Sequence, residues 1–196
     1  MQEKSERKSN KYRSEEMRAR LLSAARALFV EKGFAETSTP EIVKAAEVTR
    51  GALYHHFADK TDVFRAVVWA EAAAITEAIE AAAIGTEKDP LLAGSRGYFE
   101  AMRVPGRVRL MLIDAPAVLG LAEVAAVDAG NGRGSIAAGL REAAPGLAAA
   151  QVEALALILS AAFERAALEV AQGAPQDTYI DAFRTLWDGV VAGAPR

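Results

Sequence analysis

The densest group of side chains able to do chemistry lies between residues 49 and 60. A threonine and an arginine come first, then a tyrosine with two histidines, then a lysine: Thr49, Arg50, Tyr54, His55, His56 and Lys60. An arginine can donate two hydrogen bonds to guanine or bind a phosphate, and hydroxyl, imidazole and ammonium groups can also contact phosphates or base edges. Gly51 is small, so the backbone beside it can approach a flat partner closely. The group therefore indicates contact with a DNA duplex.

Two other interpretations of the same group carry less weight. Adjacent histidines could bind a metal ion, but consecutive helix positions point about 100° apart, and the chain has no cysteine to complete a site. Taken singly, Tyr54 could be ordinary packing and Arg50 a solvated surface charge. The combination at this spacing favours the DNA interpretation, and we expect no metal and no cofactor.

Catalysis is not expected from this sequence. No nucleophile stands beside a base, both histidines belong to the group described above, and acidic pairs such as Glu15-Glu16 suit the start of a helix better than a reaction centre. The glycine-rich run 128–134 (DAGNGRG) lacks a preceding strand and the lysine of a phosphate-binding loop. We expect a flexible loop there, and a protein that is not an enzyme.

The elements that must position the group at 49–60 are predicted to be three short helices. The first is expected from Ser14 to Lys32-Gly33, because glycine is a common signal for the end of a helix. Ser38 can cap the second helix with Glu41 as its capping-box partner, and Thr49 can cap the third. The tight turn between the second and third helices matches helix-turn-helix geometry, in which the third helix enters the major groove.

The stretch GFAETSTPEIVKAAEVTRGALYHHFADKTDVF resembles the N-terminal signature of the TetR family of bacterial repressors. The positions that agree in type and spacing are Gly33-Phe34, Thr37-Ser38-Thr39, Ile42-Val43, Val48-Thr49-Arg50-Gly51, Leu53-Tyr54-His55-His56-Phe57 and Lys60. The resemblance implies DNA contacts by Thr39, Thr49, Arg50, Tyr54, His56 and Lys60. Ser38, Gly51 and His55 complete the set of residues that we expect at the DNA. Pro40 departs from the pattern, because it offers no side-chain donor.

Charge and composition suit such a protein. The first 60 residues hold 12 Lys+Arg against 9 Asp+Glu, whereas the rest hold 11 against 17, so a slightly basic head precedes an acidic body. No window resembles a membrane span or a secretion signal, and we expect a cytoplasmic protein without a membrane partner. The arm at residues 4–13 is expected to be unstructured, either as a solvated tail or as a contact to the minor groove or the DNA backbone.

The whole chain is predicted to be all-α, because alanine is abundant and apolar residues recur at spacings of three and four. We expect a helix-turn-helix DNA-binding domain at residues 14–60 and a helical effector-binding and dimerisation domain at 61–196. Residues 61–84 would form the connecting helix. A break is expected at Gly85–Pro90, followed by helices at about 90–102, 105–114, 117–127, 135–143, 150–172 and 177–192.

The last two predicted helices carry more apolar surface than a single contact needs. Pairing with a symmetry mate would build a four-helix dimer interface. For this interface we predict Leu155, Leu159, Phe163, Phe183, Trp187 and Val190. A homodimer would place two recognition helices one turn of DNA apart, and it therefore predicts a palindromic operator.

The family resemblance further implies a small-molecule pocket in the body, between the connecting helix and the C-terminal helices. An apolar and adaptable lining is predicted from Trp69, Phe99, Met102, Met111, Leu119, Leu157 and Phe163. Each of these could instead be plain core. Polar anchors could come from Arg103, Arg107, Arg109, Asp114 or Glu164, although the three arginines could equally form a solvated face.

Together these patterns predict a homodimeric repressor of double-stranded DNA, released from its operator by a small-molecule effector. The alternative is an architectural or activating DNA-binding protein without ligand response. A regulator should prefer its own palindrome by roughly a thousandfold or more, whereas an architectural protein should bind unrelated duplexes with similar affinity.

Overall fold

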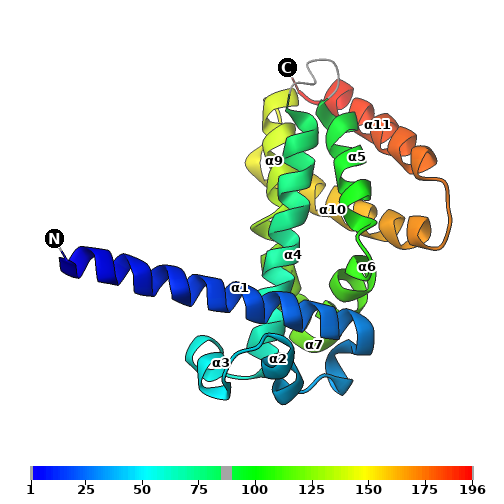
Figure 1. The fold of residues 1–196 in the computed structure, drawn as a ribbon. Helices are drawn as coiled ribbons and strands as arrows, with labels where there is room; N and C mark the ends of the chain where they lie inside the picture. The colour runs from blue at the N-terminus through cyan, green and yellow to red at the C-terminus, as the bar shows by residue number, and fades with distance from the viewer. Residues whose placement is uncertain (1, 85–89, 196) are drawn as a thin grey trace.

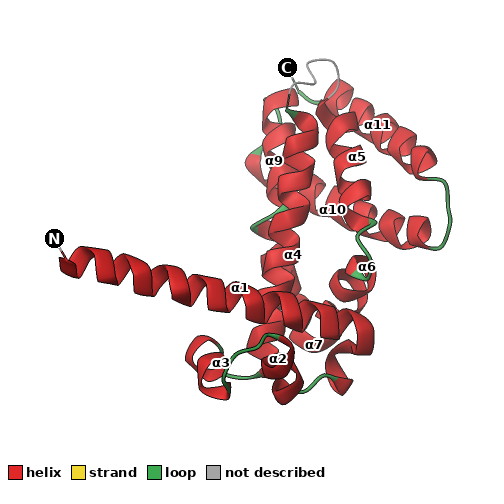
Figure 2. Cartoon of the chain, in the orientation of Figure 1, coloured by secondary structure: helices red, strands yellow, loops and turns green. Residues whose placement is uncertain are grey.

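The computed structural model describes residues 2–84 and 90–195. Every regular element in these residues is helical (Figure 2), so the all-α prediction is confirmed. The elements are α1 (Gln2–Glu36), α2 (Thr39–Ala45), α3 (Arg50–His56), α4 (Lys60–Ala83), α5 (Pro90–Met102), α6 (Arg107–Arg109), η1 (Leu110–Asp114), α7 (Ala115–Leu119), α8 (Leu121–Ala129), α9 (Gly132–Ala143), α10 (Ala149–Ala171) and α11 (Gln176–Gly193).

The long helix α4 joins the two ends of the molecule. Its N-terminal half lies among α1, α2 and α3, and its C-terminal half runs beside α5 and α9 (Figure 1). Helix α10 packs against α9, and α11 packs against α5. Helix α1 crosses α4 and extends away from the body. Residues 2–56 are called the head below, and residues 90–195 the body.

Helix α1 starts much earlier than predicted. It begins at Gln2 instead of Ser14, so the expectation of an unstructured arm at residues 4–13 was wrong. Lys, Arg, Glu and Gln are good helix formers, and neither glycine nor proline occurs before Gly33 to stop the helix. At Gly33 the backbone leaves helical geometry with φ 81° and ψ 171°. The predicted end of the regular helix at this glycine is therefore confirmed.

The predicted caps of the two short helices are present. Ser38 accepts a hydrogen bond from the backbone N–H of Glu41, whose carboxylate accepts one from the backbone N–H of Ser38 at 2.9 Å. Thr49 Oγ1 accepts from the backbone N–H of Ala52 at 3.2 Å. Such caps satisfy donors that the first helical turn cannot pair internally. Local sequence therefore fixes where α2 and α3 begin.

The predicted loop at residues 128–134 was wrong. Helix α8 continues to Ala129 and α9 begins at Gly132, so the turn contains two residues, Gly130 and Asn131. Asn131 Nδ2 donates to the Val127 carbonyl at 2.7 Å, and Ser160 Oγ donates to Asp128 Oδ1, also at 2.7 Å. These side-chain bonds hold the turn despite its glycines.

The remaining predicted boundaries agree to different degrees. Helix α4 ends at Ala83, close to the predicted Ile84, and α5, α10 and α11 lie where expected. The break predicted at Gly85–Pro90 falls on residues 85–89, which lie outside the described residues. The two helices predicted at 105–114 and 117–127 are divided into α6, η1, α7 and α8. Gly120, with φ 83°, separates the last two.

Two apolar clusters form the interior, and α4 belongs to both. The first cluster contains Phe29 and Leu53 from the head together with Leu110 from η1 and other residues of α7 and α8. The second lies inside the body and contains Phe99 and Phe163 among others. The hydrophobic core of the head therefore does not end at residue 60, because residues from the body complete it.

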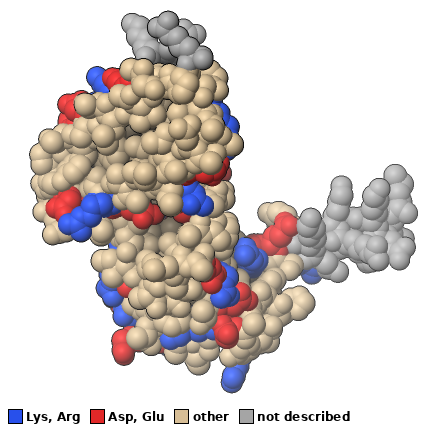
Figure 3. Space-filling view, turned by 180° about the vertical axis from the view of Figure 1, so that it is seen from behind, with Lys and Arg blue, Asp and Glu red and all other residues tan. Residues whose placement is uncertain are grey.

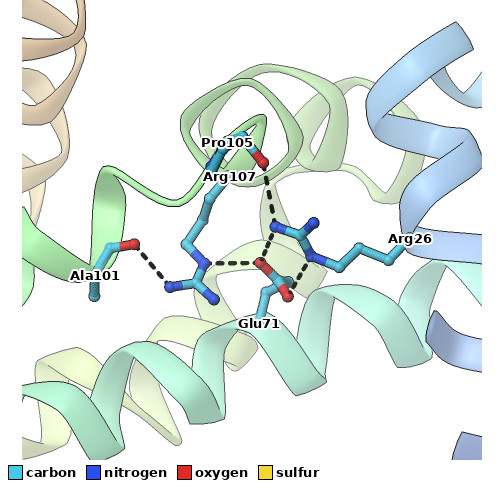
Figure 4. Close-up of polar contacts among 5 residues, drawn as sticks. All are labelled: Arg26, Glu71, Ala101, Pro105 and Arg107. Carbon is cyan, nitrogen blue, oxygen red and sulfur yellow. Dashed lines mark hydrogen bonds and ion pairs between the residues drawn. The ribbon is translucent and has the colours of Figure 1, made fainter.

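A buried ion-pair triad ties the head to the body at the middle of α4 (Figure 4). The carboxylate of Glu71 accepts from Arg26 Nε of α1 at 2.8 Å and from Arg107 Nε of α6 at 2.7 Å. The two guanidiniums also donate to the carbonyls of Pro105 and Ala101, at 3.3 and 2.7 Å. Burial raises the pKa of Glu71, but the bonds and charges of Arg26 and Arg107 outweigh it, so the pKa lies below 4.5.

The turn that carries Arg107 lies very close to α1. Gly106 has φ 78°, a left-handed conformation that side chains other than glycine rarely adopt. A Cβ atom at this position would collide with the side chain of Val30. Glycine is therefore required here on two counts, and the close approach brings Arg107 within reach of Glu71.

Replacing Glu71 with glutamine is expected to lower the free energy of unfolding by about 3 kcal/mol, since two largely buried guanidiniums lose their carboxylate. Urea denaturation near neutral pH measures the change. Glu77→Gln, at an exposed position of the same helix, is the control and should change stability by less than about 0.5 kcal/mol.

The difference between the wild type and Glu71→Gln should depend on pH. Because the folded-state pKa of Glu71 is below its usual value of 4.5, its stabilisation is complete above that pH and is lost as the pH falls through the folded-state pKa. The two unfolding curves should therefore converge in acid. Equal stability of both proteins at neutral pH would contradict the role assigned to the triad.

Candidate nucleic-acid interface and internal cavity

The two short helices of the head expose one face of α3 and bury the other. Ile42 of α2 and Leu53 of α3 are fully buried, and Phe57 closes the end of α3. Arg50 and Gly51 are exposed on the opposite side, as are Tyr54 and His55 one turn later. These four exposed residues all belong to the set predicted at the DNA, and they share one face of α3.

Tyr54 is the centre of a polar cluster that spans α2 and α3. Its side chain is 44% exposed, and the Arg50 guanidinium lies 5.5 Å from the centre of its ring. Hydrogen bonds from Thr39 and then from Arg50 hold the pKa of the Tyr54 hydroxyl below its usual value. Three of the residues predicted at the DNA therefore meet in space, although Thr39 belongs to a different helix.

The two histidines have different surroundings. His55 is exposed, whereas His56 is half-buried with its ring 6.2 Å from that of Phe57. Burial, and then the charges of His55 and Arg18, lowers the pKa of His56 below 6.5. Each cause favours the uncharged imidazole, which can still take part in a hydrogen bond.

Arg18 was missed by the sequence reasoning. It lies exposed on α1 with its guanidinium 5.5 Å from the centre of the Phe57 ring, which places a cation beside the C-terminal end of α3. No local sequence spacing connects residue 18 with residue 57, because the contact arises where α1 packs against α3. An exposed cation here adds to the electrostatic attraction for phosphates.

Lys60, the first residue of α4, is bound to the head. Its ammonium donates to the backbone carbonyls of Phe34 at 2.7 Å and Ala35 at 3.3 Å, and it lies 4.2 Å from the centre of the Phe34 ring. The ammonium group has three donors, so one remains for a phosphate. Lys60 thus has a structural role in the head, and its contact with DNA stays a prediction.

Ser38 and Pro40 lie at the exposed start of α2. The Ser38 hydroxyl donates to Glu41 Oε2 at 2.7 Å, and Lys32 pairs with the other carboxylate oxygen at 2.6 Å. The hydrogen bond from Lys32, followed by those from Ser38, lowers the pKa of Glu41 to about 2. Ser38 thus serves the cap while remaining accessible, and Thr49 does the same for α3.

Charged side chains are unevenly distributed over the surface. On the face shown in Figure 3, Lys, Arg, Asp and Glu gather over the lower part of the molecule and at the waist, while most of the upper part is uncharged. The lower part is the end that contains the head. Positive and negative charges alternate there, so a DNA contact would depend on particular arginines more than on a broad basic surface.

A cavity of about 290 Å³ lies inside the body, between α4 and the C-terminal helices. Helix α4 contributes Val68, Ala72 and Ile75, and η1 contributes Met111 and Leu112. The wall also contains four aromatic side chains, Tyr98, Phe163, Phe183 and Trp187. This is the place where the resemblance implied a pocket, and its volume is close to the lower limit for small-molecule sites.

The predicted lining residues are only partly at this cavity. Met102, Met111 and Phe163 line it, whereas Phe99, buried in the body core, borders a second cavity between the α5–α6 turn and the end of α10. The other three do not line the main cavity: Trp69, Leu119 and Leu157. The reason is the direction in which these side chains leave their helices. Trp69 and Leu157 are 40% and 50% exposed, and Leu119 packs against the head core.

Of the five predicted polar anchors, Glu164 alone lines the main cavity. Arg107 belongs to the buried triad, and the other three lie in pairs away from this cavity: Arg103 with Glu100, and Arg109 with Asp114. Asp128 also lines the cavity. Sequence reasoning missed it because the residue was assigned to a flexible loop.

The residues predicted at the dimer interface do not coincide with the exposed apolar residues of α10 and α11. Leu159, Phe163 and Phe183 are buried within the chain, and the rings of Phe163 and Phe183 stack at 3.7 Å. These three assignments were wrong, because the intramolecular core uses that face of α10. Leu155, Trp187 and Val190 are half-buried. The exposed large apolar side chains of these helices are Leu157, Ile158 and Leu186.

In residues 2–84 and 90–195, no group of three or more His, Asp or Glu side chains is arranged to hold a metal ion. No described helix combines the length and apolar character needed to cross a membrane.

Two family models match the chain. Residues 21–67 match the bacterial regulatory proteins of the tetR family, and residues 89–193 match the tetracyclin repressor-like C-terminal domain. The chain belongs to the TetR family. It is a transcriptional regulator with a helix-turn-helix head and a helical body, as the resemblance implied. The relatives are regulators, in agreement with the expectation that the chain is not an enzyme.

Matches to two curated TetR-family proteins cover less than a third of the chain. The chain is 47% identical over 57 residues to the transcriptional regulator AcrR of Shigella flexneri, a match that covers 29% of this chain and 26% of AcrR. It is 43% identical over 53 residues to the transcriptional repressor BepR of Brucella suis, covering 27% and 25%. The matches span about a quarter of these relatives, so their other properties do not transfer directly.

Solved structures extend the similarity over the body. A TetR-family regulator from Pectobacterium atrosepticum has 32% identity and a TM-score of 0.68, covering 94% of this chain and 98% of that one. A putative TetR-family regulator from Syntrophomonas wolfei has a TM-score of 0.71 at 17% identity, covering 91% and 96%. The second likeness concerns the fold alone.

The turn between α2 and α3 contains a strained residue. Glu47 has φ 54°, in the left-handed region where a Cβ atom costs about 1–2 kcal/mol. The backbone needs this conformation to redirect the chain, because Val48 donates to the Val43 carbonyl at 3.2 Å before α3 begins. An exposed carboxylate therefore occupies a position that glycine would fit without strain.

Glu47→Gly is expected to raise the free energy of unfolding by about 0.5–1 kcal/mol, since relief of the strain exceeds the greater entropy of glycine in the unfolded chain. Thermal or urea unfolding measures the gain. Lys44→Gly, within the helical backbone of α2, is the matched control and should lose about the same amount. Destabilisation by both substitutions would show that the turn is not strained.

Proposed function

We propose that this TetR-family regulator is a homodimeric repressor that binds a palindromic operator and is released from it by a small-molecule effector. The observation that carries the DNA-binding part is the cluster of half-buried Thr39 with exposed Arg50 and Tyr54, beside Gly51. In this proposal Arg50 reads a base edge or holds a phosphate from the N-terminal end of α3. Further DNA contacts around Arg50 come from Ser38, Thr49, His55, His56 and Lys60.

Exposed apolar side chains on the last two helices support a dimer. Leu157, Ile158 and Leu186 are 50%, 63% and 53% exposed, and Ala154 and Ala161 stand one turn away on the same side of α10. Apolar side chains grouped in this way are typical of a surface that a partner covers. Two chains paired through α10 and α11 would build a four-helix interface and present two heads to one duplex.

Helix α4 gives the effector a physical route to the head. Val68, Ala72 and Ile75 face the cavity, whereas Glu71, on the same turn of the helix, holds Arg26 of the head. A ligand that shifts α4 would therefore act on the triad as well as on the cavity wall. Two states with different separations of the heads, of which the ligand favours one, would account for release.

The π-helical turn η1 provides a second connection. Met111 and Leu112 line the cavity, while the preceding residue, Leu110, is buried in the core of the head. Short π-helical turns are frequent at functional sites. A ligand against Met111 would therefore contact a segment that also packs against the DNA-binding helices.

Arg50→Ala is expected to weaken operator binding by about 10- to 100-fold, the cost of losing a bidentate base contact or a phosphate contact, and Tyr54→Phe to weaken it less. An operator is first selected from random duplexes with the wild-type protein, and affinities are then measured by fluorescence anisotropy at fixed salt. Arg141→Ala, at an exposed arginine of α9, removes the same charge far from the head and outside the proposed dimer surface. Unchanged affinity of Arg50→Ala would refute the proposed interface.

Ile158→Glu is expected to raise the dimer dissociation constant by about 30-fold or more, because it places a charge in the centre of an apolar contact. Analytical ultracentrifugation measures the constant. Leu121→Glu makes the same chemical change at another exposed apolar residue, on α8, and should leave the dimer intact. A wild-type protein that stays monomeric at micromolar concentration would contradict the proposal.

A further inference from the structure

The wall of the main cavity combines apolar and aromatic side chains with carboxylates. Glu164 and Asp128 lie in the wall, and Glu80 lies near its edge. The described lining contains neither lysine nor arginine. Ionised carboxylates in an apolar wall are costly unless a cation or several donors face them. The cavity therefore has a negative potential that its own lining does not neutralise.

The two central carboxylates differ in their partners. Asp128 accepts from Ser160 Oγ at 2.7 Å and pairs with Arg133 at 3.6 Å, so its charge is largely balanced. In the described part of the chain, no donor reaches the carboxylate of Glu164. Burial, and then the charge of Asp128, raises the pKa of Glu164. Each cause disfavours a negative charge at Glu164 while the cavity holds no cation.

Tyr98 provides an independent sign of a missing partner. Its hydroxyl is buried and has no hydrogen-bond partner among the described residues, although Tyr98 lines the cavity within the electrostatic field of Glu164 and Asp128. Buried hydroxyl groups in folded proteins almost always find a partner. An orphan hydroxyl in a cavity wall therefore points to a ligand that supplies one.

Aromatic rings in contact with one another form part of the cavity wall. The ring of Phe163 lies 5.3 Å from that of Tyr98, in an edge-to-face arrangement, and 3.7 Å from that of Phe183. Trp187 completes the aromatic part of the lining. Aromatic faces attract organic cations and at the same time shield the apolar groups attached to them.

We propose that the cavity binds a small organic cation with an apolar body, a protonated amine whose N–H group donates a hydrogen bond. Its charge lies beside Glu164 and its apolar part against the aromatic wall, and the Tyr98 hydroxyl completes the polar contacts. This inference names the chemical class of the effector and rests on the proposed function for its role in release from DNA.

Other ligand classes fit the wall less well. An anion would meet the carboxylates without a compensating lysine or arginine in the described lining. A neutral apolar molecule would leave the Glu164 carboxylate and the Tyr98 hydroxyl unpaired. A divalent metal ion needs about six oxygen ligands, whereas Asp128 is already committed to Ser160 and Arg133.

The test compares three probes of similar shape on the full chain: protonated N,N-dimethylbenzylamine, its neutral isostere isobutylbenzene, and the anion phenylacetate. Isothermal titration calorimetry and fluorescence quenching of Trp187, which lines the cavity, measure binding. We expect the cation to bind at least about tenfold more tightly than the neutral isostere, and the anion most weakly. Equal or tighter binding of the neutral probe or the anion would overturn the proposal.

Site variants locate the binding. Glu164→Gln should weaken the cation by about tenfold and leave the neutral probe unchanged. Glu153→Gln on the exposed side of the same helix should change neither. Thermal unfolding checks that the Glu164→Gln protein is folded, and if it is not, Tyr98→Phe replaces it with the same expectation of selective loss. Cation binding that is indifferent to the folded variant overturns the proposal.

The final measurement separates this inference from the proposed function. Operator binding is measured by anisotropy with and without saturating cation. If the cation binds through Glu164 but the protein stays on the operator, the ligand class is supported and release is refuted. If the operator is bound but the cavity does not prefer the cation, the DNA-binding assignment stands and this inference fails.

Discussion

The carboxylate of Glu71, held between Arg26 and Arg107, is the interaction on which the arrangement of head and body depends. Each of the three charges comes from a different part of the chain: α1 of the head, the connecting helix α4, and the short helix α6 of the body. The buried carboxylate is tolerated because two guanidiniums donate to it. Two backbone carbonyls accept hydrogen bonds from the same guanidiniums. The pairing geometry therefore selects one position of α6 against α1, and the absence of a Cβ atom at Gly106 permits this close approach.

Helix α4 transmits that constraint in both directions. The head cannot be sealed without Leu110 and other residues of the body, and the cavity cannot be formed without Val68, Ala72 and Ile75 of α4. Shared walls of this kind make a change at one site felt at the other, because close-packed interiors do not deform without repacking. If the proposed effector binds in the cavity, these shared walls would carry its effect to the head.

Selection for stability alone would not place these polar side chains in the cavity wall. Glu164 beside Asp128, and a Tyr98 hydroxyl without a partner, are unfavourable in an apolar wall. Leucine and phenylalanine at two of these positions would bury more apolar surface at no electrostatic cost. Their polar character is understandable if the cavity is completed by a ligand, and it explains why the body retains a space that its own side chains do not fill.

The amino-acid sequence by itself determined the local features: the caps at Ser38 and Thr49, the end of the regular helix at Gly33, and the exposed chemistry of α3. These features depend on residues three or four positions apart, so they can be recognised from the sequence. Tertiary structure alone decided which face of α10 is buried, because that helix is apolar on several sides and only packing against its neighbours chooses between them. It also decided the partners of Glu71, 45 and 36 residues away in the chain, and the meeting of Tyr98, Asp128 and Glu164 from three helices. Contacts at such separations are set by the path of the whole chain, and no local pattern encodes them.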